Sequence, residues 1–205
     1  MALIKLNNKA VSNATAFGSI SSLGSMVFIK KLTASSSSTL SFVDGASSVV
    51  LDNTYKEYLF TYNNIHGSQD NAFFQVGFRD GGSDYDAPKT TSHFKAQHSE
   101  DNTYASVDYQ ADGDLAQSTD FQQLTRNSGN DNDQSVSGYL HLFNPSSTTF
   151  VKHFIGRGSS YQFENLNMDS FVAGYCNTTT AIDGVQFKFS GGTIDVGDIC
   201  LYGIA

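Results

Sequence analysis

One segment in the first third of the chain constrains the fold more than any other feature. In residues 55–65, the aromatic side chains of Tyr58, Phe60 and Tyr62 stand at every second position. Residues two apart share a face of an extended strand, whereas a helix would need a spacing of three or four. The core of this chain is therefore predicted to be built from β-strands. The same alternation recurs in three further groups: Phe74, Val76 and Phe78; Val136, Gly138, Leu140 and Leu142; and Val185, Phe187 and Phe189.

The composition favours the same fold class. The chain has 16 Phe, 10 Tyr, 18 Gly and no Trp, and only three of its 20 acidic residues are Glu. Strands and turns favour Phe, Tyr, Asp, Ser and Gly, whereas surface helices favour Glu, Lys and Ala. No helical pattern of roughly twelve residues occurs, so we expect about eight to ten short strands. The candidate segments are residues 26–32, 39–43, 55–65, 74–78, 92–97, 103–109, 121–124, 136–143, 149–157, 170–176, 182–189 and 194–204.

Two pairs of neighbouring segments predict β-hairpins. Residues 136–143 and 149–157 are separated by a turn that begins with Asn144-Pro-Ser-Ser. Residues 182–189 and 194–204 are separated by Ser190-Gly-Gly-Thr. Many short strands at regular spacing are typical of an all-β, antiparallel β-sandwich, and a jelly roll is the topology we favour.

The length of 205 residues is sufficient for one sizeable β domain and short for two. Residues 26–205 are predicted to form this sandwich domain. Residues 1–25 are small and polar with scattered apolar side chains, and we expect an extended N-terminal arm that orders only against a partner.

The net charge of −8 argues against nucleic acid as a partner, because phosphate contacts require clustered Lys and Arg. Residues 96–151 contain eight acidic residues and one basic residue, Arg126, so this region carries 1 − 8 = −7 and is expected to face solvent. No apolar run approaches the roughly 20 residues that span a bilayer, and the first residues lack the apolar stretch of a signal peptide. We therefore expect no membrane partner and synthesis in a host cytoplasm. Cys176 and Cys200 are predicted to be buried free thiols.

The sequence offers no recognisable catalytic or cofactor motif. It contains no phosphate-binding Gly-rich loop, no His-Glu-x-x-His, no Cys-x-x-Cys and no Gly-x-Ser-x-Gly. His93 and His98 are five residues apart, which places them on opposite faces of a strand. His141 and His153 could meet across the first hairpin, but no carboxylate close in sequence completes a metal site. We expect a non-enzymatic protein without a metal or other cofactor.

Tyrosines near the predicted loops are candidates for glycan binding. Tyr85, Tyr104, Tyr109 and Tyr161 lie outside the clearest strand patterns and have Asn and Asp neighbours. Such rings can stack on the apolar face of a pyranose, whereas most other aromatic residues alternate as core residues do. These four residues are therefore the predicted contacts for a glycan.

One set of stretches carries a resemblance to known proteins. Its members are Ala2 to Ala10, Thr54 to Tyr58, Asn64 to His66, Leu140 to Phe154, Thr178 to Asp183, Gly191 to Asp195 and Leu201 to Ile204. These stretches resemble a family of small structural proteins, of the decoration or fibre type, encoded by tailed phages that infect marine bacteria. The similarity covers most of the chain and implies a virion protein, located in the virion after synthesis in the host. It carries no catalytic or binding motif.

Three functional hypotheses follow from these features. The first is a capsid-exterior decoration or cement protein, whose arm lays Leu3, Ile4 and Leu6 onto a neighbouring subunit. The second is a receptor-binding tip or adaptor of a tail fibre that recognises a cell-surface glycan. The third is a lectin-like or glycan-cleaving protein that acts outside a particle. Under the two virion hypotheses the partners are other capsid or tail proteins, and we expect a homo-oligomer, with a trimer as the favoured state.

Overall fold

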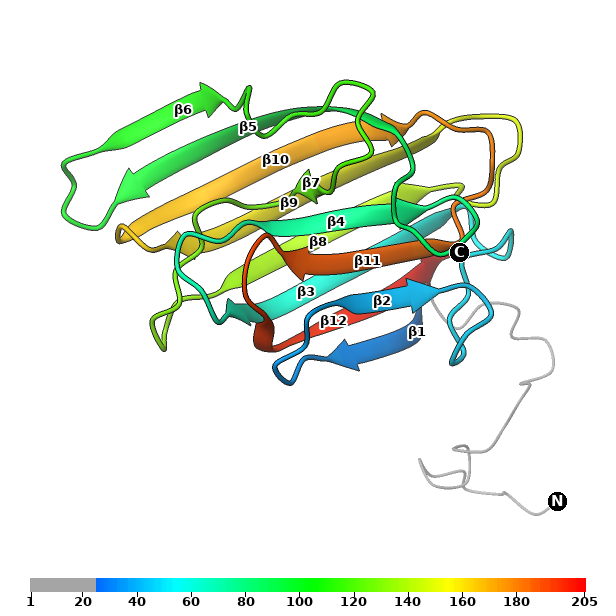
Figure 1. Ribbon diagram of the computed structural model, residues 1–205, viewed down its shortest axis with the longest axis horizontal. Helices are drawn as coiled ribbons and strands as arrows, with labels where there is room; N and C mark the ends of the chain where they lie inside the picture. The colour runs from blue at the N-terminus through cyan, green and yellow to red at the C-terminus, as the bar shows by residue number, and fades with distance from the viewer. Residues whose placement is uncertain (1–24) are drawn as a thin grey trace, which may run out of the picture.

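The computed structural model describes residues 25–205, which form two antiparallel sheets packed face to face (Figure 1). The larger sheet has eight strands in the order β1-β12-β3-β8-β9-β10-β5-β6, and the smaller has four in the order β2-β11-β4-β7. This arrangement confirms the predicted antiparallel β-sandwich, while the jelly-roll topology stays a prediction. The strands are β1 Met26–Thr33, β2 Leu40–Val43, β3 Glu57–Gly67, β4 Phe74–Arg79, β5 Lys89–Ser99, β6 Ala105–Tyr109, β7 Gln122–Gln123, β8 Val136–Phe143, β9 Lys152–Gln162, β10 Leu166–Cys176, β11 Gly184–Phe189 and β12 Ile194–Ile204.

The predicted N-terminal arm, residues 1–25, lies outside the described residues except for Ser25. Its proposed contact residues Leu3, Ile4 and Leu6 lie outside them too, so the arm stays a prediction.

Residues 25–205 form twelve strands, more than the eight to ten expected, because the short candidates also pair. The larger difference concerns length: β5, β9 and β10 each extend over 11 residues. Their extra residues are largely Lys, Thr, Ser, Gln and Asn, which carry no apolar alternation. Continuous pairing along β10, from Leu166 to Cys176, extends these strands beyond the segments that the sequence marks.

The half of the sandwich nearest β1 has an aromatic core. The alternating rings of β3, Tyr58, Phe60 and Tyr62, are fully buried, as predicted. Phe187 of β11 stands among them, 5.6 Å from Phe60 and 6.5 Å from Tyr62 between ring centroids. Burial of each ring removes a large apolar area from water, which stabilises the fold. Edge-to-face or offset contacts between the rings add to this stabilisation. These buried rings therefore hold the two sheets together.

The predicted hairpin between residues 136–143 and 149–157 is confirmed by the pairing of β8 with β9. The second predicted hairpin is wrong, because β11 and β12 belong to different sheets. The turn at Ser190–Thr193 carries the chain from one layer to the other. Both strands point apolar side chains into the core, Phe187 from one sheet and Leu201 from the other. An alternating pattern cannot distinguish such a crossing from a hairpin, since burial of one face is the same in both.

The other half of the sandwich is covered differently. The four-stranded sheet is narrower than its partner, and the segment from residue 110 to 135, which includes its edge strand β7, continues this layer over β9, β10 and β5 (Figure 1). This half of the interior is polar, with Gln97, Gln122, Gln134 and Gln162 all buried. Buried amides require partners, and here Gln97 Nε2 donates to Gln162 Oε1 at 2.7 Å.

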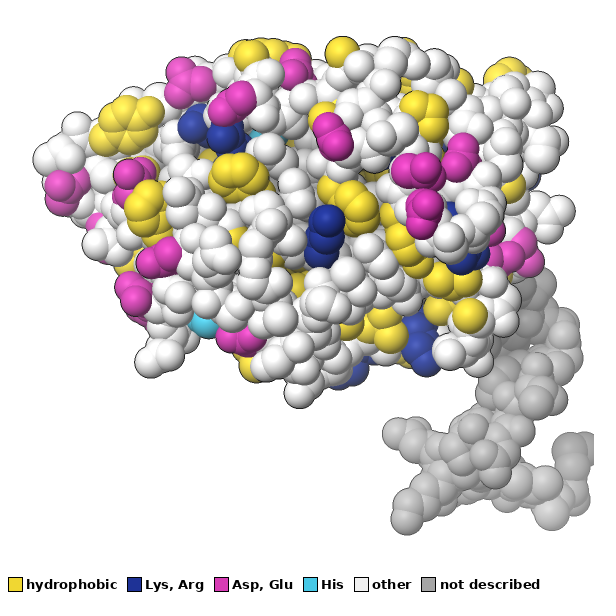
Figure 2. Space-filling view, viewed as in Figure 1, with side chains coloured by type: hydrophobic (Ala, Val, Ile, Leu, Met, Phe, Trp, Pro, Cys, Tyr) yellow, Lys and Arg dark blue, Asp and Glu magenta, His cyan; other side chains and the backbone are white. Residues whose placement is uncertain are grey.

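The prediction that the acidic central region, residues 96–151, faces solvent is only partly right. Of its eight acidic residues, seven are exposed and Asp114 is half-buried, as a solvent-facing region requires. The polar residues between them are not loop surface, however, because Gln122, Thr125 and Ser128 are buried beneath the segment they belong to. Figure 2 shows acidic side chains gathered at the end of the molecule where β5 meets β6 and at the opposite end. Sequence polarity alone gave no sign that this segment completes the core.

Candidate binding surfaces

Among residues 25–205, no second sheet covers the outer face of the eight-stranded sheet. Along each strand one set of alternate residues faces the core, so the other set faces outward. In β9, for example, Phe154 and Ser160 are buried, whereas Ile155 and Ser159 are exposed. The register between strands places these outward residues in rows that cross the sheet.

Three neighbouring rows on this face are rich in aromatic and apolar side chains, and we call them the aromatic band. Phe28, Phe94, Tyr109 and Ile155 of the band are between 45% and 58% exposed. Soluble proteins seldom leave a contiguous apolar area of this kind without a partner. The rows, which also contain Glu57 in the first and Thr61 and Cys200 in the third, have these band members: Met26, Ile204, Phe143, His153 and Tyr175; Phe28, Tyr202, Leu59, His141, Ile155 and Ala173; and Tyr139, Arg157, Phe171, Phe94 and Tyr109.

Side chains within the band are ordered by their neighbours. Phe94 stacks on Phe171 with ring centroids 4.7 Å apart and an interplanar angle of 4°. The guanidinium of Arg157 lies 4.7 Å above the Phe171 ring and binds the carboxylate of Asp169 through two hydrogen bonds of 2.9 and 2.6 Å. This bidentate contact raises the pKa of Arg157 further, so the guanidinium stays charged and fixed over the ring.

A polar contact between two strands lies on the same face. His141 Nδ1 contacts the Glu57 carboxylate across the β3–β8 pair, and the His141 ring stacks beside Phe143. The sequence analysis found no carboxylate near His141, because Glu57 lies 84 positions earlier in the chain. The expected meeting of His141 with His153 does not take place across the pair, since His141 lies opposite Ile155.

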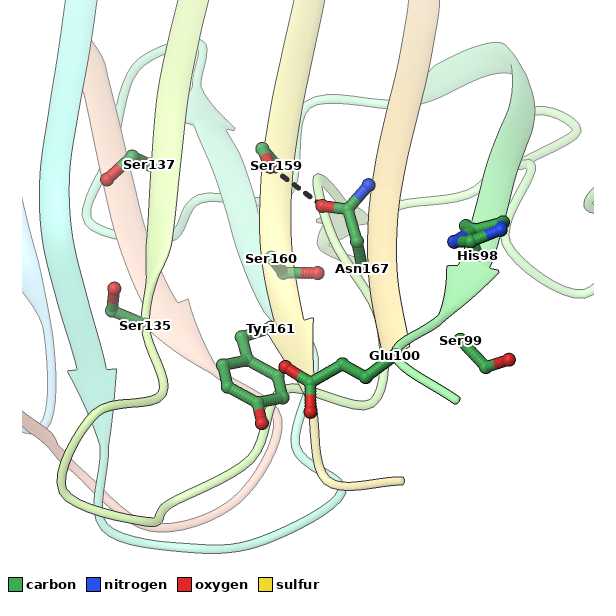
Figure 3. A pocket seen from close by; sticks show the side chains of 9 residues that line it. All are labelled: His98, Ser99, Glu100, Ser135, Ser137, Ser159, Ser160, Tyr161 and Asn167. Atoms are coloured by element: carbon green, nitrogen blue, oxygen red, sulfur yellow. Dashed lines mark hydrogen bonds between the residues drawn. The ribbon is translucent and has the colours of Figure 1, made fainter. Parts of the chain in front are cut away.

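A polar groove adjoins the aromatic band at one end of the sheet, and we call it the end groove. It consists of two hollows of 390 and 540 Å³ that share Ser99 and Glu100 and lie on opposite faces of the sheet end. Figure 3 shows the first hollow, where Tyr161 and Glu100 lie side by side and Asn167 and His98 stand further along neighbouring strands. The second hollow lies beyond Glu100 and is lined by Tyr104, Asn127 and Glu164 among others. Both volumes fall within the range of about 300–1,000 Å³ that is typical of small-molecule sites.

Two tight turns build the rim of the groove. In the β5–β6 turn, Ser99 Oγ accepts hydrogen bonds from the backbone N–H groups of Thr103 at 3.1 Å and Tyr104 at 2.9 Å. Asn102 in this turn has a φ of 59°, a left-handed conformation that Asn tolerates better than most residues. The backbone N–H of Glu100 donates to the Asn165 carbonyl at 3.2 Å, which ties this turn to the β9–β10 turn.

The buried amides described above form the floor. Gln162, at the end of β9, accepts a hydrogen bond from the Gln97 amide. Its own Nε2 donates a hydrogen bond to the Arg126 carbonyl at 3.2 Å. Asn127 lies directly after Arg126 and lines the second hollow. The groove therefore rests on hydrogen-bonded amides rather than on loops alone.

The structure separates the four tyrosines that the sequence analysis singled out. Tyr104 and Tyr161 come together at the end groove, one in each hollow. Tyr85 lines a different hollow, with Phe121 and Gln186. Tyr109 belongs to the aromatic band and donates its hydroxyl to Asp114. The groove residues Glu100 and Asn167 were missed, because no periodicity marks a residue in or beside a turn.

The remaining predicted residues are placed as follows. His93 is buried and His98 is exposed, which confirms their opposite faces. Cys176 and Cys200 are both free thiols, but only Cys176 is buried and Cys200 is half-buried. Within residues 25–205, no group of three His, Cys, Asp or Glu side chains is arranged to hold a metal ion. The same residues contain no helix long and apolar enough to cross a membrane.

Comparison with known proteins adds no relative: the chain matches no protein-family model, no curated protein and no solved structure.

Proposed function

We propose that this protein is a structural component of a tailed-phage virion and that it decorates the exterior of the capsid. The observation that supports this proposal most is the aromatic band on the outer face of the eight-stranded sheet. The band offers a non-catalytic contact surface that the monomer leaves exposed, as a subunit of a larger assembly requires.

The size of this face suits a specific protein interface. Eight strands at a spacing of about 4.8 Å cross about 34 Å, and strands of 11 residues run for about 36 Å. The face as a whole thus offers on the order of 1,200 Å², more than the roughly 800 Å² that each partner buries in a standard interface. Between Ile155 and Tyr175, the small residue Ala173 leaves a hollow of 550 Å³ that could receive a side chain of the partner.

The chemistry of the band also suits an interface. Phe, Tyr and Arg are the residues that contribute most at the centres of protein contacts. The charges of Arg157 and Asp169 satisfy one another, so they can be covered without leaving an isolated charge. The exposed acidic residues of the central region lie in other parts of the molecule and would face solvent on the particle.

The sequence supplies the rest of the proposal. The N-terminal arm, with Leu3, Ile4 and Leu6, would add contacts to a neighbouring subunit. The protein would act as a homo-oligomer, with a trimer as the favoured state, and its partners would be other virion proteins.

Antibody-gold labelling of purified particles, together with counting of the copies per particle, tests the proposal. Hundreds of copies over the head would support capsid decoration. A few copies at the tail would overturn decoration in favour of the second candidate below, and absence from the particle would overturn both.

A receptor-binding tip or adaptor of the tail is the second candidate function. One observation favours it, which is the end groove with a tyrosine in each of its two hollows. The copy number and position on the particle distinguish this candidate from decoration.

A further inference from the structure

We infer that the first hollow of the end groove binds a sugar unit of a neutral oligosaccharide, with Tyr161 as the stacking ring and Glu100 as the central acceptor of sugar hydroxyls. This inference deepens the second candidate function by naming the ligand class. It rests on the groove alone, and a decoration protein could carry the same site.

The first hollow has room for a sugar unit on the outer face of the sheet. Its volume is 390 Å³, and its outward side chains include His98, Ser159 and Asn167. The second hollow shares Ser99 and Glu100 with it but lies on the opposite face, where Lys95 and Gln97 line it. A sugar unit in the first hollow would therefore contact Tyr161.

The polar groups of the first hollow match a ring of hydroxyls. Glu100 presents a carboxylate, which can accept hydrogen bonds from two adjacent hydroxyls. Asn167 Oδ1 accepts from Ser159 at 3.3 Å, while its Nδ2 has no acceptor among residues 25–205 and can donate to the ligand. Ser135 and Ser137 add hydroxyls on the neighbouring strand (Figure 3).

The aromatic ring supplies the apolar contact that a pyranose needs. Tyr161 is half-buried at the end of β9, and its hydroxyl donates to Asn165 Oδ1 at 3.2 Å. Partial desolvation, and then the neighbouring Glu100 carboxylate, raises the pKa of Tyr161, so the phenol stays protonated at neutral pH. A neutral ring keeps its negative π face available for the polarised C–H groups of a sugar.

The charges around the groove select against acidic ligands. Glu100, Asp101 and Glu164 line the second hollow, against one basic residue, Lys95. Hydrogen bonds from Thr103 and Ser99 lower the pKa of Asp101, which therefore stays ionised. Uronic acids, sulphated sugars and phosphorylated sugars would bring like charges into this site and would be disfavoured.

Titration of the isotope-labelled full chain with defined sugars, followed by NMR of the backbone amides, tests the inference. The neutral probes are chitotriose, maltotriose, laminaritriose and mannotriose, and the acidic probe is trigalacturonate. We expect at least one neutral trisaccharide to shift the amides of residues 98–104 and 159–167, and trigalacturonate to shift none of them. Failure of all four neutral probes at their solubility limits, or equal binding of the acidic probe, would overturn the inference.

Three variants locate the site. Tyr161→Ala should weaken binding of the neutral trisaccharide by about tenfold or more, equivalent to about 1.4 kcal/mol. Glu100→Gln keeps the shape, and it should weaken the neutral probe while allowing the acidic probe to bind. Tyr85→Ala is the matched control, because this tyrosine lines a separate hollow. The affinity of this variant for the neutral trisaccharide should stay within about twofold of wild type.

Thermal unfolding and the dispersion of the NMR spectrum show whether each variant is folded. Wild-type affinity in a folded Tyr161→Ala variant would contradict the inference, as would an equal loss in Tyr85→Ala. Labelling of particles tests the virion proposal by a separate measurement, so the failure of either one leaves the other standing.

Discussion

The Tyr62 hydroxyl donates a hydrogen bond to the Arg157 carbonyl at 3.0 Å and joins the aromatic core to β9. The side chain reaches this carbonyl by passing Gly138 on the intervening strand β8. A Cβ atom at Gly138 would stand 2.8 Å from the Tyr62 hydroxyl oxygen and 2.2 Å from the Arg157 carbonyl oxygen. The glycine therefore makes room for the buried phenol, whose pKa is raised by burial.

Gly138→Ala should destabilise the protein by about 2 kcal/mol or more, because the added methyl group must displace Tyr62 or the β9 backbone. The loss is measured as a lower midpoint of urea unfolding with an unchanged slope. Gly156→Ala is the matched control, since its nearest neighbours would lie at 3.3–3.4 Å. A loss at Gly138 no larger than the loss at Gly156 would contradict the role assigned to this glycine.

His93 should make the fold sensitive to mild acid. Burial lowers the pKa of His93 to about 4, and its two ring nitrogens have no partner among the described residues. The unfolded chain would titrate near pH 6.5, so between pH 6.5 and 4 it binds more protons than the folded chain does. The free energy of unfolding should therefore fall as pH is lowered through this window, by up to about 3 kcal/mol at about 1.4 kcal/mol per unit. Urea midpoints at pH 7 and pH 4.5 measure the change.

His93→Phe should flatten this pH dependence, because a ring of similar shape replaces the group that takes up the proton. His98→Phe is the control, since His98 is exposed on the opposite face of β5. Carboxylates with lowered pKa values, such as Asp112 at about 2, stay ionised at pH 4.5 and do not obscure the comparison. An unchanged pH dependence in the His93 variant would show that another group carries the acid sensitivity.

The two cysteines should differ in reactivity and should not form a disulfide. Burial raises the pKa of Cys176 to about 12, whereas Cys200 lies half-buried on the outer face of β12. Four strand spacings separate β12 from β10, about 19 Å, far beyond the roughly 4.4–6.8 Å that a disulfide allows between Cα atoms. Mass spectrometry after treatment of the native protein with iodoacetamide should find Cys200 modified first. Cys176 should react only after unfolding, and early modification of Cys176 would contradict its buried position.

Polar substitutions in the aromatic band should weaken assembly more than folding. Ile155→Ser removes a side chain that is 49% exposed, so the free energy of unfolding should change by less than about 1 kcal/mol. The loss of an apolar contact at the centre of an interface should weaken attachment to the particle by about tenfold. The measurement is the fraction of protein that stays with particles in a density gradient.

Phe150→Ser is the matched control for this prediction. Phe150 is 69% exposed but lies in the β8–β9 connection, outside the rows of the band. Equal retention of the two variants on particles would remove the aromatic band from the proposed interface.

The alternation of apolar residues was sufficient to predict the strands and their buried faces. Tyr58, Phe60 and Tyr62 are buried as their spacing required, since a side-chain period of two fixes which residues share a face. The end groove could be predicted only in part. Tyr161 and Tyr104 were identified as loop aromatics, but they lie 57 positions apart, and no local pattern brings their turns together. Glu100 carried no signal, because a single exposed acid in a turn resembles any other.

Local side-chain chemistry thus determined the fold class, the approximate positions of the strands and the apolar core residues of this protein. Tertiary structure alone decided which strands share a sheet, as the separation of β11 from β12 demonstrates. It also decided that residues 110–135 cover the interior and that two turns build one groove. The physical reason is that the face on which a side chain lies depends only on its position relative to its neighbours along the strand. Strand order and the meeting of distant turns depend instead on contacts between segments that the sequence keeps far apart.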